Sequence, residues 1–337
     1  MSGFTFHFPY FPTHRIDPTA RLRLATVSFL ALSSALTAGS AWADCSTDGL
    51  AKTCSGTLGV VNFTDASTTS DETASLTIEN ATNLGFTNTQ TNNNAIWMLN
   101  VGAPEYSQAP AGAVLDIDLD GFLLVTNRGP GAEVLSTGSV GQTHGKSKGS
   151  GKHEGKPGGA GGAGGQVTAT IAGLNVNAAA EAILISSSGA AGGDGAEGHS
   201  TGFGRGYGGD GGVGGDGGAV TVTLTDSALS LGTGLVVEST GGNGGDGGVG
   251  MAADYSAHGG DGGNGGQGGD VIVQVADLTS TNGNTGIVAV SHGGQGGEGG
   301  VGENTLTSTG DGGAGGVGGA GGSVLVSNTT PGGTGTL

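Results

Sequence analysis

A unit of about 52 residues recurs along the chain, and this repeat constrains the fold more than any other feature. The first inward-facing residues of five successive units are spaced at steps of 52, 53, 51 and 53: Leu115, Val167, Val220, Val271 and Val324. Self-similarity at a fixed period indicates a repeat architecture, in which one unit cannot bury its own apolar face but stacked units can. The spacing therefore predicts a solenoid.

Each unit is expected to contain two strands. In Val220-Thr-Val-Thr-Leu224 apolar residues alternate with threonines, which is the period of a strand with one buried face. A second apolar strand follows, as at Leu235–Val237 and Ile287–Val290, and Leu76-Thr-Ile78 begins an earlier unit that has no long insert. Strands that repeat in one direction predict an all-β fold, a short parallel β-helix with long glycine-rich GGx inserts between its coils.

The inserts are runs of glycine triplets such as GGNGGDGGV at 241–249, and they account for most of the 78 glycines. Because glycine loses more conformational freedom on folding than any other residue, we expect flexible or partly ordered loops. The alternative is a polyproline II helix, whose three residues per turn would place two glycine rows against neighbouring helices and turn the third residue outward. A collagen triple helix is excluded because proline is scarce.

Residues 1–43 are predicted to be a cleaved export signal. Three arginines precede an uncharged apolar stretch at 24–41, and Ala41-Trp-Ala43 has the small-x-small pattern of a cleavage site. Residues 44–74 would then form the N-terminal edge of the mature chain, and residues 75–337 would form the repeated units.

The two cysteines, Cys45 and Cys54, begin the predicted mature chain. An oxidising compartment allows them to pair, and Asp48-Gly49 between them suits a turn. We therefore expect a structural disulfide at this edge.

The predicted mature chain is strongly acidic. Without residues 1–43, which hold three arginines and one aspartate, it has seven basic and 27 acidic residues, a net charge of −20. Binding to nucleic acid is not expected, because affinity for phosphate backbones comes from Lys and Arg. Four of the seven basic residues lie in Lys146–Lys156, which we interpret as a soluble loop, with contact to an anionic glycan or lipopolysaccharide as the alternative.

No catalytic, cofactor or metal site is predicted, and no enzyme is expected. Asp116–Gly121 matches the start of an EF-hand loop, but Asn127 stands where a glutamate is needed, so we expect a strand with outward aspartates. GGNGGDGGV begins like a calcium-binding nonapeptide, yet Gly248 replaces its aliphatic residue, which leaves calcium as the weaker alternative. Five histidines match no zinc spacing and are interpreted as solvated: His144, His153, His199, His258 and His292.

The motif Gly286-Ile-Val-Ala-Val-Ser291, which runs into GGQGGEGG, resembles the passenger region of Gram-negative autotransporters. The export signal, Asp44-Cys45 and Cys54-Ser-Gly56 extend the resemblance over residues 44–337. It implies export through the inner membrane, a cell-surface or extracellular location associated with the outer membrane, and an adhesin-like structural role. The implied partner is a host or environmental surface, a glycan or another copy of the chain. The β-barrel of that family is not found before Leu337, so we expect a truncated passenger or another export route.

The sequence is also compatible with two other functions. Rows of outward threonines and glycine triplets would suit an ice- or surface-binding repeat protein, although the outward positions vary between Thr168, Thr221 and Ile272. A polysaccharide-active β-helix enzyme is the less favoured alternative.

Overall fold

The protein is described from a computed structural model. The predicted signal, residues 1–43, lies outside the described residues. The backbone is described for 44–48, 51–55, 61–65, 73–79, 96–101, 114–120, 123–126, 132–173, 175–178, 183–230, 234–281, 286–306 and 310–329. Side chains are described for 132–173, 183–229, 234–279, 286–306 and 310–329.

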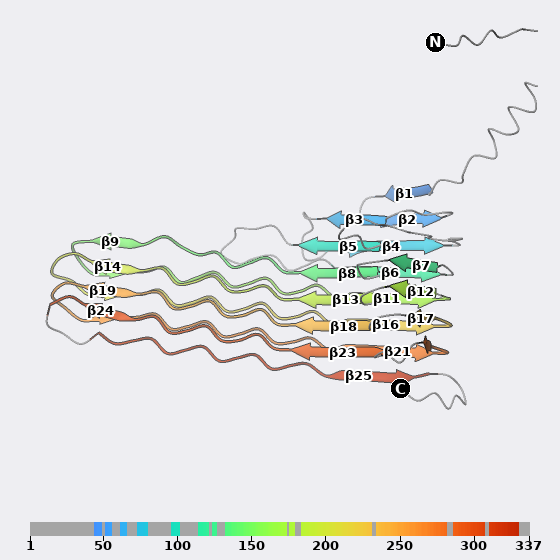
Figure 1. Cartoon of the computed structure of the whole chain (residues 1–337). Helices are drawn as coiled ribbons and strands as arrows, with labels where there is room; N and C mark the ends of the chain where they lie inside the picture. Colours follow the sequence, from blue (N-terminus) through green and yellow to red (C-terminus); the bar gives the residue numbers. More distant parts are fainter. Residues whose placement is uncertain are drawn as a thin grey trace, which may run out of the picture. The chain divides into compact units, whose positions relative to one another are not determined.

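The described residues form strands and no helix, and nearly all the strands pair in parallel (Figure 1). The first sheet has eight strands: β1 (Asp44–Asp48), β2 (Ala51–Ser55), β4 (Thr73–Glu79), β6 (Val114–Asp120), β11 (Val167–Ala172), β16 (Val220–Thr225), β21 (Val271–Ala276) and β25 (Val324–Asn328). Another sheet has six: β3 (Val61–Asp65), β5 (Ile96–Val101), β8 (Ala132–Thr137), β13 (Ile183–Ser188), β18 (Leu235–Thr240) and β23 (Ile287–His292). This arrangement confirms the predicted parallel β-helix.

Stacking follows the predicted repeat residue by residue. The five residues that defined the period, from Leu115 to Val324, lie in one row of directly paired positions in the first sheet. The earlier unit begins two residues sooner than predicted, because Ala74, rather than Leu76, pairs with Leu115. Alanine is too small to mark an apolar alternation clearly, which explains the displaced start.

The core lies between the first sheet and the six-stranded sheet. Along β16 the side chains alternate, and Val220, Val222 and Leu224 are all 0% exposed. Leu235 and Val237 of β18 are also fully buried. Burial of apolar area stabilises at roughly 25 cal/mol per Å². Repetition of these rows therefore supplies the core that a single coil lacks.

A third, four-stranded sheet was not predicted. It consists of β7 (Leu123–Thr126), β12 (Asn175–Ala178), β17 (Ala228–Ser230) and β22 (Thr279–Thr281). Before it the chain bends through equivalent residues with positive φ: Gly173 at 61°, Asp226 at 46° and Asp277 at 53°. Glycine and aspartate tolerate this left-handed conformation better than most residues. These strands have only three or four residues each, which is too short to show an alternation, so the sequence indicates only turns.

The glycine tracts are ordered, and the prediction of flexible loops was wrong. After the six-stranded sheet each long insert leaves along an outgoing tract (138–146, 189–197, 241–249 and 293–301) and comes back along a returning tract (155–166, 208–219, 259–270 and 312–323). Figure 1 shows these tracts running side by side between the solenoid strands and the short strands at their far end. Backbone hydrogen bonds connect them along their whole length.

The triplet repeat follows from this hydrogen bonding. The N–H of the first glycine in a triplet, such as Gly244, donates to an outward residue of the next coil, the carbonyl of Gln295, at 2.8 Å. The second N–H, that of Gly245, donates at 2.8 Å to Gly212 in the returning tract of the preceding coil. A Cβ on Gly244 would lie 1.9 Å from the Gly263 carbonyl oxygen, so only glycine fits. The alternative of ordered tracts is therefore the correct interpretation, and their hydrogen bonding repeats every three residues, as a polyproline II helix would require.

A row of serines, buried except for the half-buried Ser291, joins the tracts to the solenoid. Ser136, Ser187, Ser239 and Ser291 occupy equivalent positions in the six-stranded sheet. The Ser187 hydroxyl donates to the Gly165 carbonyl at 2.7 Å and accepts the Gly218 N–H at 3.0 Å, so it connects two successive returning tracts. The last residue of the Gly286–Ser291 motif is thus part of this junction.

Candidate functional site

The outward residues of the triplets carry most of the bundle's carboxylates, and these carboxylates have a structural role. The Asp194 carboxylate accepts the N–H of Asp246 at 3.0 Å, and Asp246 in turn accepts the N–H of Glu298 at 2.8 Å. On the returning side Asp210 accepts from Asp261 at 2.9 Å in the same way. Each carboxylate therefore satisfies a backbone donor of the next coil that would otherwise face only water.

This ladder changes the interpretation of the calcium-like segment. Asp246 belongs to GGNGGDGGV, but its carboxylate is bonded to the backbone of the following coil. Within the part of the chain whose side chains are described, no group of three or more His, Cys, Asp or Glu could hold a metal ion. Residues 116–120 of the segment that resembles an EF-hand loop lie in strand β6 (Val114–Asp120), as the sequence predicts. Their side chains are outside the described residues.

The far end of the bundle, which we call the tip, comprises residues 147–154, 198–207, 250–258 and 302–306. Two short parallel sheets build it. The first contains β9 (Ser147–Gly149), β14 (Gly198–Ser200), β19 (Gly250–Ala252) and β24 (Gly302–Asn304), and the second contains β10 (His153–Glu154), β15 (Gly206–Tyr207) and β20 (Ala257–His258). The turns between these strands hold the side chains that differ from insert to insert.

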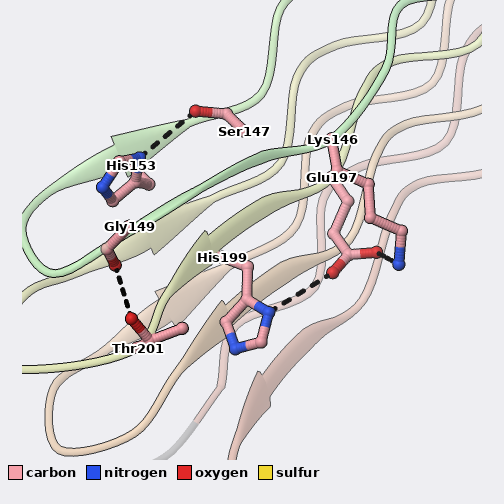
Figure 2. Close-up of polar contacts among 7 residues, drawn as sticks. All are labelled: Lys146, Ser147, Gly149, His153, Glu197, His199 and Thr201. Carbon is pink, nitrogen blue, oxygen red and sulfur yellow. Dashed lines mark hydrogen bonds and ion pairs between the residues drawn. The ribbon is translucent and has the colours of Figure 1, made fainter.

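The turns are held by polar contacts between coils (Figure 2). The backbone N–H and the hydroxyl of Thr201 both donate to the Gly149 carbonyl, at 2.8 and 3.1 Å. Lys146 pairs with Glu197 at 2.5 Å, and His199 lies 3.8 Å from the same carboxylate. The lysine cluster, which was predicted to be a soluble loop, therefore lies in and next to an ordered tip.

The histidines do not form a common site. His199 and His258 belong to different coils of the tip, and His153 lies 3.3 Å from the Ser147 hydroxyl. His144 lies in the first outgoing tract, and His292 ends β23.

Tyr207 is the centre of a column of side chains at the tip. Its ring stacks on His258 at 5.0 Å with an interplanar angle of 15°, and the Lys152 ammonium lies 5.1 Å from its centroid. His258 continues the column to Asp311 at 3.3 Å. Such contacts hold a tyrosine ring in one orientation without burying it.

Two cations adjoin this ring. The Arg205 guanidinium donates to the Tyr207 hydroxyl at 3.4 Å, and this bond is the main reason that the pKa of Arg205 is raised. Lys152 forms an ion pair with Glu154, whose hydrogen bond raises the pKa of the lysine. Both side chains are exposed and stay charged at neutral pH.

A groove of about 430 Å³ opens beside the column. It is lined by residues of three successive coils: Lys152, Phe203, Gly204, Arg205, Tyr207 and Tyr255. Phe203 is 83% exposed and Tyr255 is 47% exposed. Sequence analysis missed this site. Phe203 and Tyr255, in the middle of the second and third inserts, are the aromatic residues that could have indicated it. They come together only when the coils stack.

The cysteines lie opposite each other at the N-terminal edge. Strands β1 and β2 pair antiparallel, and Cys45 is directly opposite Cys54 in this register. Their side chains are outside the described residues, so the disulfide remains a prediction. None of the described segments forms a helix long and apolar enough to cross a membrane.

No family model matches the sequence, and no curated protein matches it. Among solved structures, this chain is similar to the nine polyproline type II helical bundle springtail antifreeze protein from Granisotoma rainieri. The match has 21% identity over 55% of this chain and 93% of that one, with a TM-score of 0.09. A TM-score this low does not define a shared fold.

Proposed function

We propose that this protein is an exported structural protein of the adhesin type, displayed at the cell surface or released from it. In this role the β-helix is the scaffold and the glycine-rich bundle is a rigid arm that presents the tip. One observation carries the proposal: ordered tracts end in exposed aromatic and basic side chains, with Phe203 83% exposed. Recognition residues on a rigid scaffold are typical of binding proteins.

The composition of the surface supports a role for the tip rather than for the faces of the bundle. The faces carry carboxylates that are already bonded to the backbone, such as Asp194 and Asp261. Five of the seven basic residues after position 43 lie in or next to the tip: Lys146, Lys148, Lys152, Lys156 and Arg205. The tip is thus chemically distinct from the acidic remainder of the mature chain.

Ice binding is the second candidate, because the stacked tracts present regular outward rows. The residues in these rows are mixed, however. One row of the returning tracts contains Val213, Asn264 and Val317, and the row beside it contains Asp210, Asp261 and Ala314. A face that matches ice would need the same residue type along each row. Thermal hysteresis of the purified chain tests this alternative directly, and a value above that of an unrelated acidic protein would favour ice binding.

Export and adhesion are tested together with the full chain expressed in a Gram-negative bacterium. The mature protein should begin at Asp44, contain no free thiol and be reached by antibody on intact cells. Beads coated with it should attach to cells or to polysaccharide-coated surfaces, and the Phe203→Ser, Tyr255→Ser double variant should attach less. Retention inside the cell with Met1 intact, or equal attachment of both bead types, would contradict the proposal.

A further inference from the structure

The groove at the tip is open to solvent and large enough for a small ligand. Its volume of about 430 Å³ falls within the range of roughly 300–1,000 Å³ that is usual for such sites. Three coils contribute to it through Lys152, Arg205 and Tyr255. Hydrogen bonds between the coils hold its walls, including the bonds from Thr201 to Gly149. The groove therefore exists before any ligand arrives, which lowers the entropic cost of binding.

The aromatic walls suit a flat ligand with weakly polar C–H groups. Phe203 leaves most of its ring in water, which is unfavourable for an apolar group unless a partner covers it. The face of an aromatic ring carries partial negative charge, so it attracts the slightly positive C–H groups on the face of a sugar ring. Tyr207 is held beside the groove by His258 and Lys152, so its position is fixed.

The cations specify the charge of the ligand. A guanidinium has five N–H donors, and the described side-chain hydrogen bond of Arg205, to the Tyr207 hydroxyl, uses only one of its nitrogens. Among the described side chains no carboxylate forms an ion pair with Arg205. Its planar fork matches a carboxylate or sulfate in bidentate geometry. Lys152 adds a second positive charge to the same groove, and this charge is also paired with the Glu154 carboxylate.

We propose that this groove binds an acidic sugar residue of a polysaccharide, with the sugar ring on Phe203 and Tyr255 and the acid group on Arg205 and Lys152. This inference rests on the proposed adhesin-like function and names its ligand class. The carboxylates along the bundle repel anions, so an acidic polymer is directed to the tip. The Debye length is about 8 Å at physiological ionic strength, so binding weakens as salt is added.

The test is calorimetric titration of the full mature chain with three probes: an oligogalacturonate, its neutral methyl ester and a sulfated heparin oligosaccharide. Binding of either acidic probe, with the methyl ester at least about tenfold weaker than the oligogalacturonate, is the expected result. The two acidic arms distinguish a carboxylate ligand from a sulfate ligand. Measurable binding of the methyl ester that is as tight as binding of the oligogalacturonate, or no binding of any probe, would overturn the inference.

Variants separate the groove from general charge. Arg205→Gln and Phe203→Ala should each lower the affinity for the acidic probe by about tenfold. The melting temperature should not change, because both side chains are exposed. Lys156→Gln removes an equal charge next to the tip but outside the groove, and it should change the affinity less than about twofold. If Lys156→Gln weakens binding as much as Arg205→Gln, the groove is not the site. If beads attach to cells but attachment is unaffected by oligogalacturonate, heparin oligosaccharide or Arg205→Gln, the proposed function stands and this inference fails.

Discussion

The Ser239 hydroxyl donates a hydrogen bond to the Gly218 carbonyl at 2.8 Å across the boundary between two coils. It also accepts the N–H of Gly269 at 2.8 Å, and Gly269 belongs to the returning tract of its own coil. One small side chain thus satisfies backbone groups of two glycine tracts where they enter the solenoid.

Ser239→Ala should destabilise the protein by about 2–4 kcal/mol, because it leaves two backbone groups without a partner at a position that is 0% exposed. Thr223→Ala, at a partly exposed position, is the control and should cost less than about 0.5 kcal/mol. Denaturant unfolding followed by circular dichroism measures both. Equal stability of Ser239→Ala and wild type would show that the junction contributes nothing.

Gly262 and Gly315 occupy equivalent positions in successive returning tracts and offer a matched pair. A Cβ on Gly262 would lie 2.2 Å from the Gly297 carbonyl oxygen, whereas on Gly315 its nearest neighbour would be 3.7 Å away. Gly262→Ala should therefore cost about 1–3 kcal/mol through overpacking, and Gly315→Ala should be neutral or slightly stabilising. Melting temperatures of the two variants decide this. Similar losses at both sites would argue against close packing of the tracts.

The carboxylate ladder predicts a difference between two replacements of Asp246. Asp246→Ala removes the acceptor for the Glu298 N–H and should cost about 0.5–1.5 kcal/mol, with faster amide exchange at Glu298. Asp246→Asn should preserve protection, because Asn243 already accepts the N–H of Gln295 through its side chain at 2.9 Å. Hydrogen exchange resolved at single residues provides the measurement, and loss of protection in both variants would mean that charge, rather than the acceptor oxygen, matters.

Val222 and Thr223 lie on opposite faces of strand β16, so aspartate substitutions at the two positions should differ in their cost to stability. Val222 is 0% exposed and pairs with Ala169 and Val273, so Val222→Asp buries an unpaired charge and should cost more than about 4 kcal/mol. Thr223→Asp places the same charge on the outer side and should cost less than about 1 kcal/mol. Equal shifts of the unfolding midpoint would contradict the observed register.

The hydrogen bonds of Asp270 make the stability of the protein depend slightly on pH. Hydrogen bonds from Ser323, first from its hydroxyl at 2.6 Å, lower the pKa of Asp270 below its usual 3.8. Because the folded-state pKa is depressed, the interaction stabilises the protein above pH 3.8 and is lost as the pH falls through the lower folded value. Ser323→Ala should therefore be less stable than wild type at pH 6, and the difference should shrink below pH 3.8. A difference that is constant with pH would exclude this linkage.

The sequence by itself determined the coil. Alternation at Val220–Leu224 and steps of 51–53 residues were enough to predict parallel strands and the pairing of Val220 with Val167 and Val271. This is possible because strand burial has a period of two and stacking repeats it, so both are local patterns written directly in the residues.

Only the tertiary structure decided whether the glycine tracts are ordered or flexible. A single tract such as 241–249 has no partner for its backbone groups, and the ordering entropy of glycine favours a loop. Neighbouring tracts of other coils supply those partners, as Gly212 and Gln295 do for Gly245 and Gly244.

The groove required the same long-range information. Lys152, Arg205 and Tyr255 are about 50 residues apart in the chain and meet only because ordered tracts of equal length carry successive turns to one end. The sequence therefore determined the scaffold through local periodicity, whereas the arm and its tip depend on hydrogen bonds between coils.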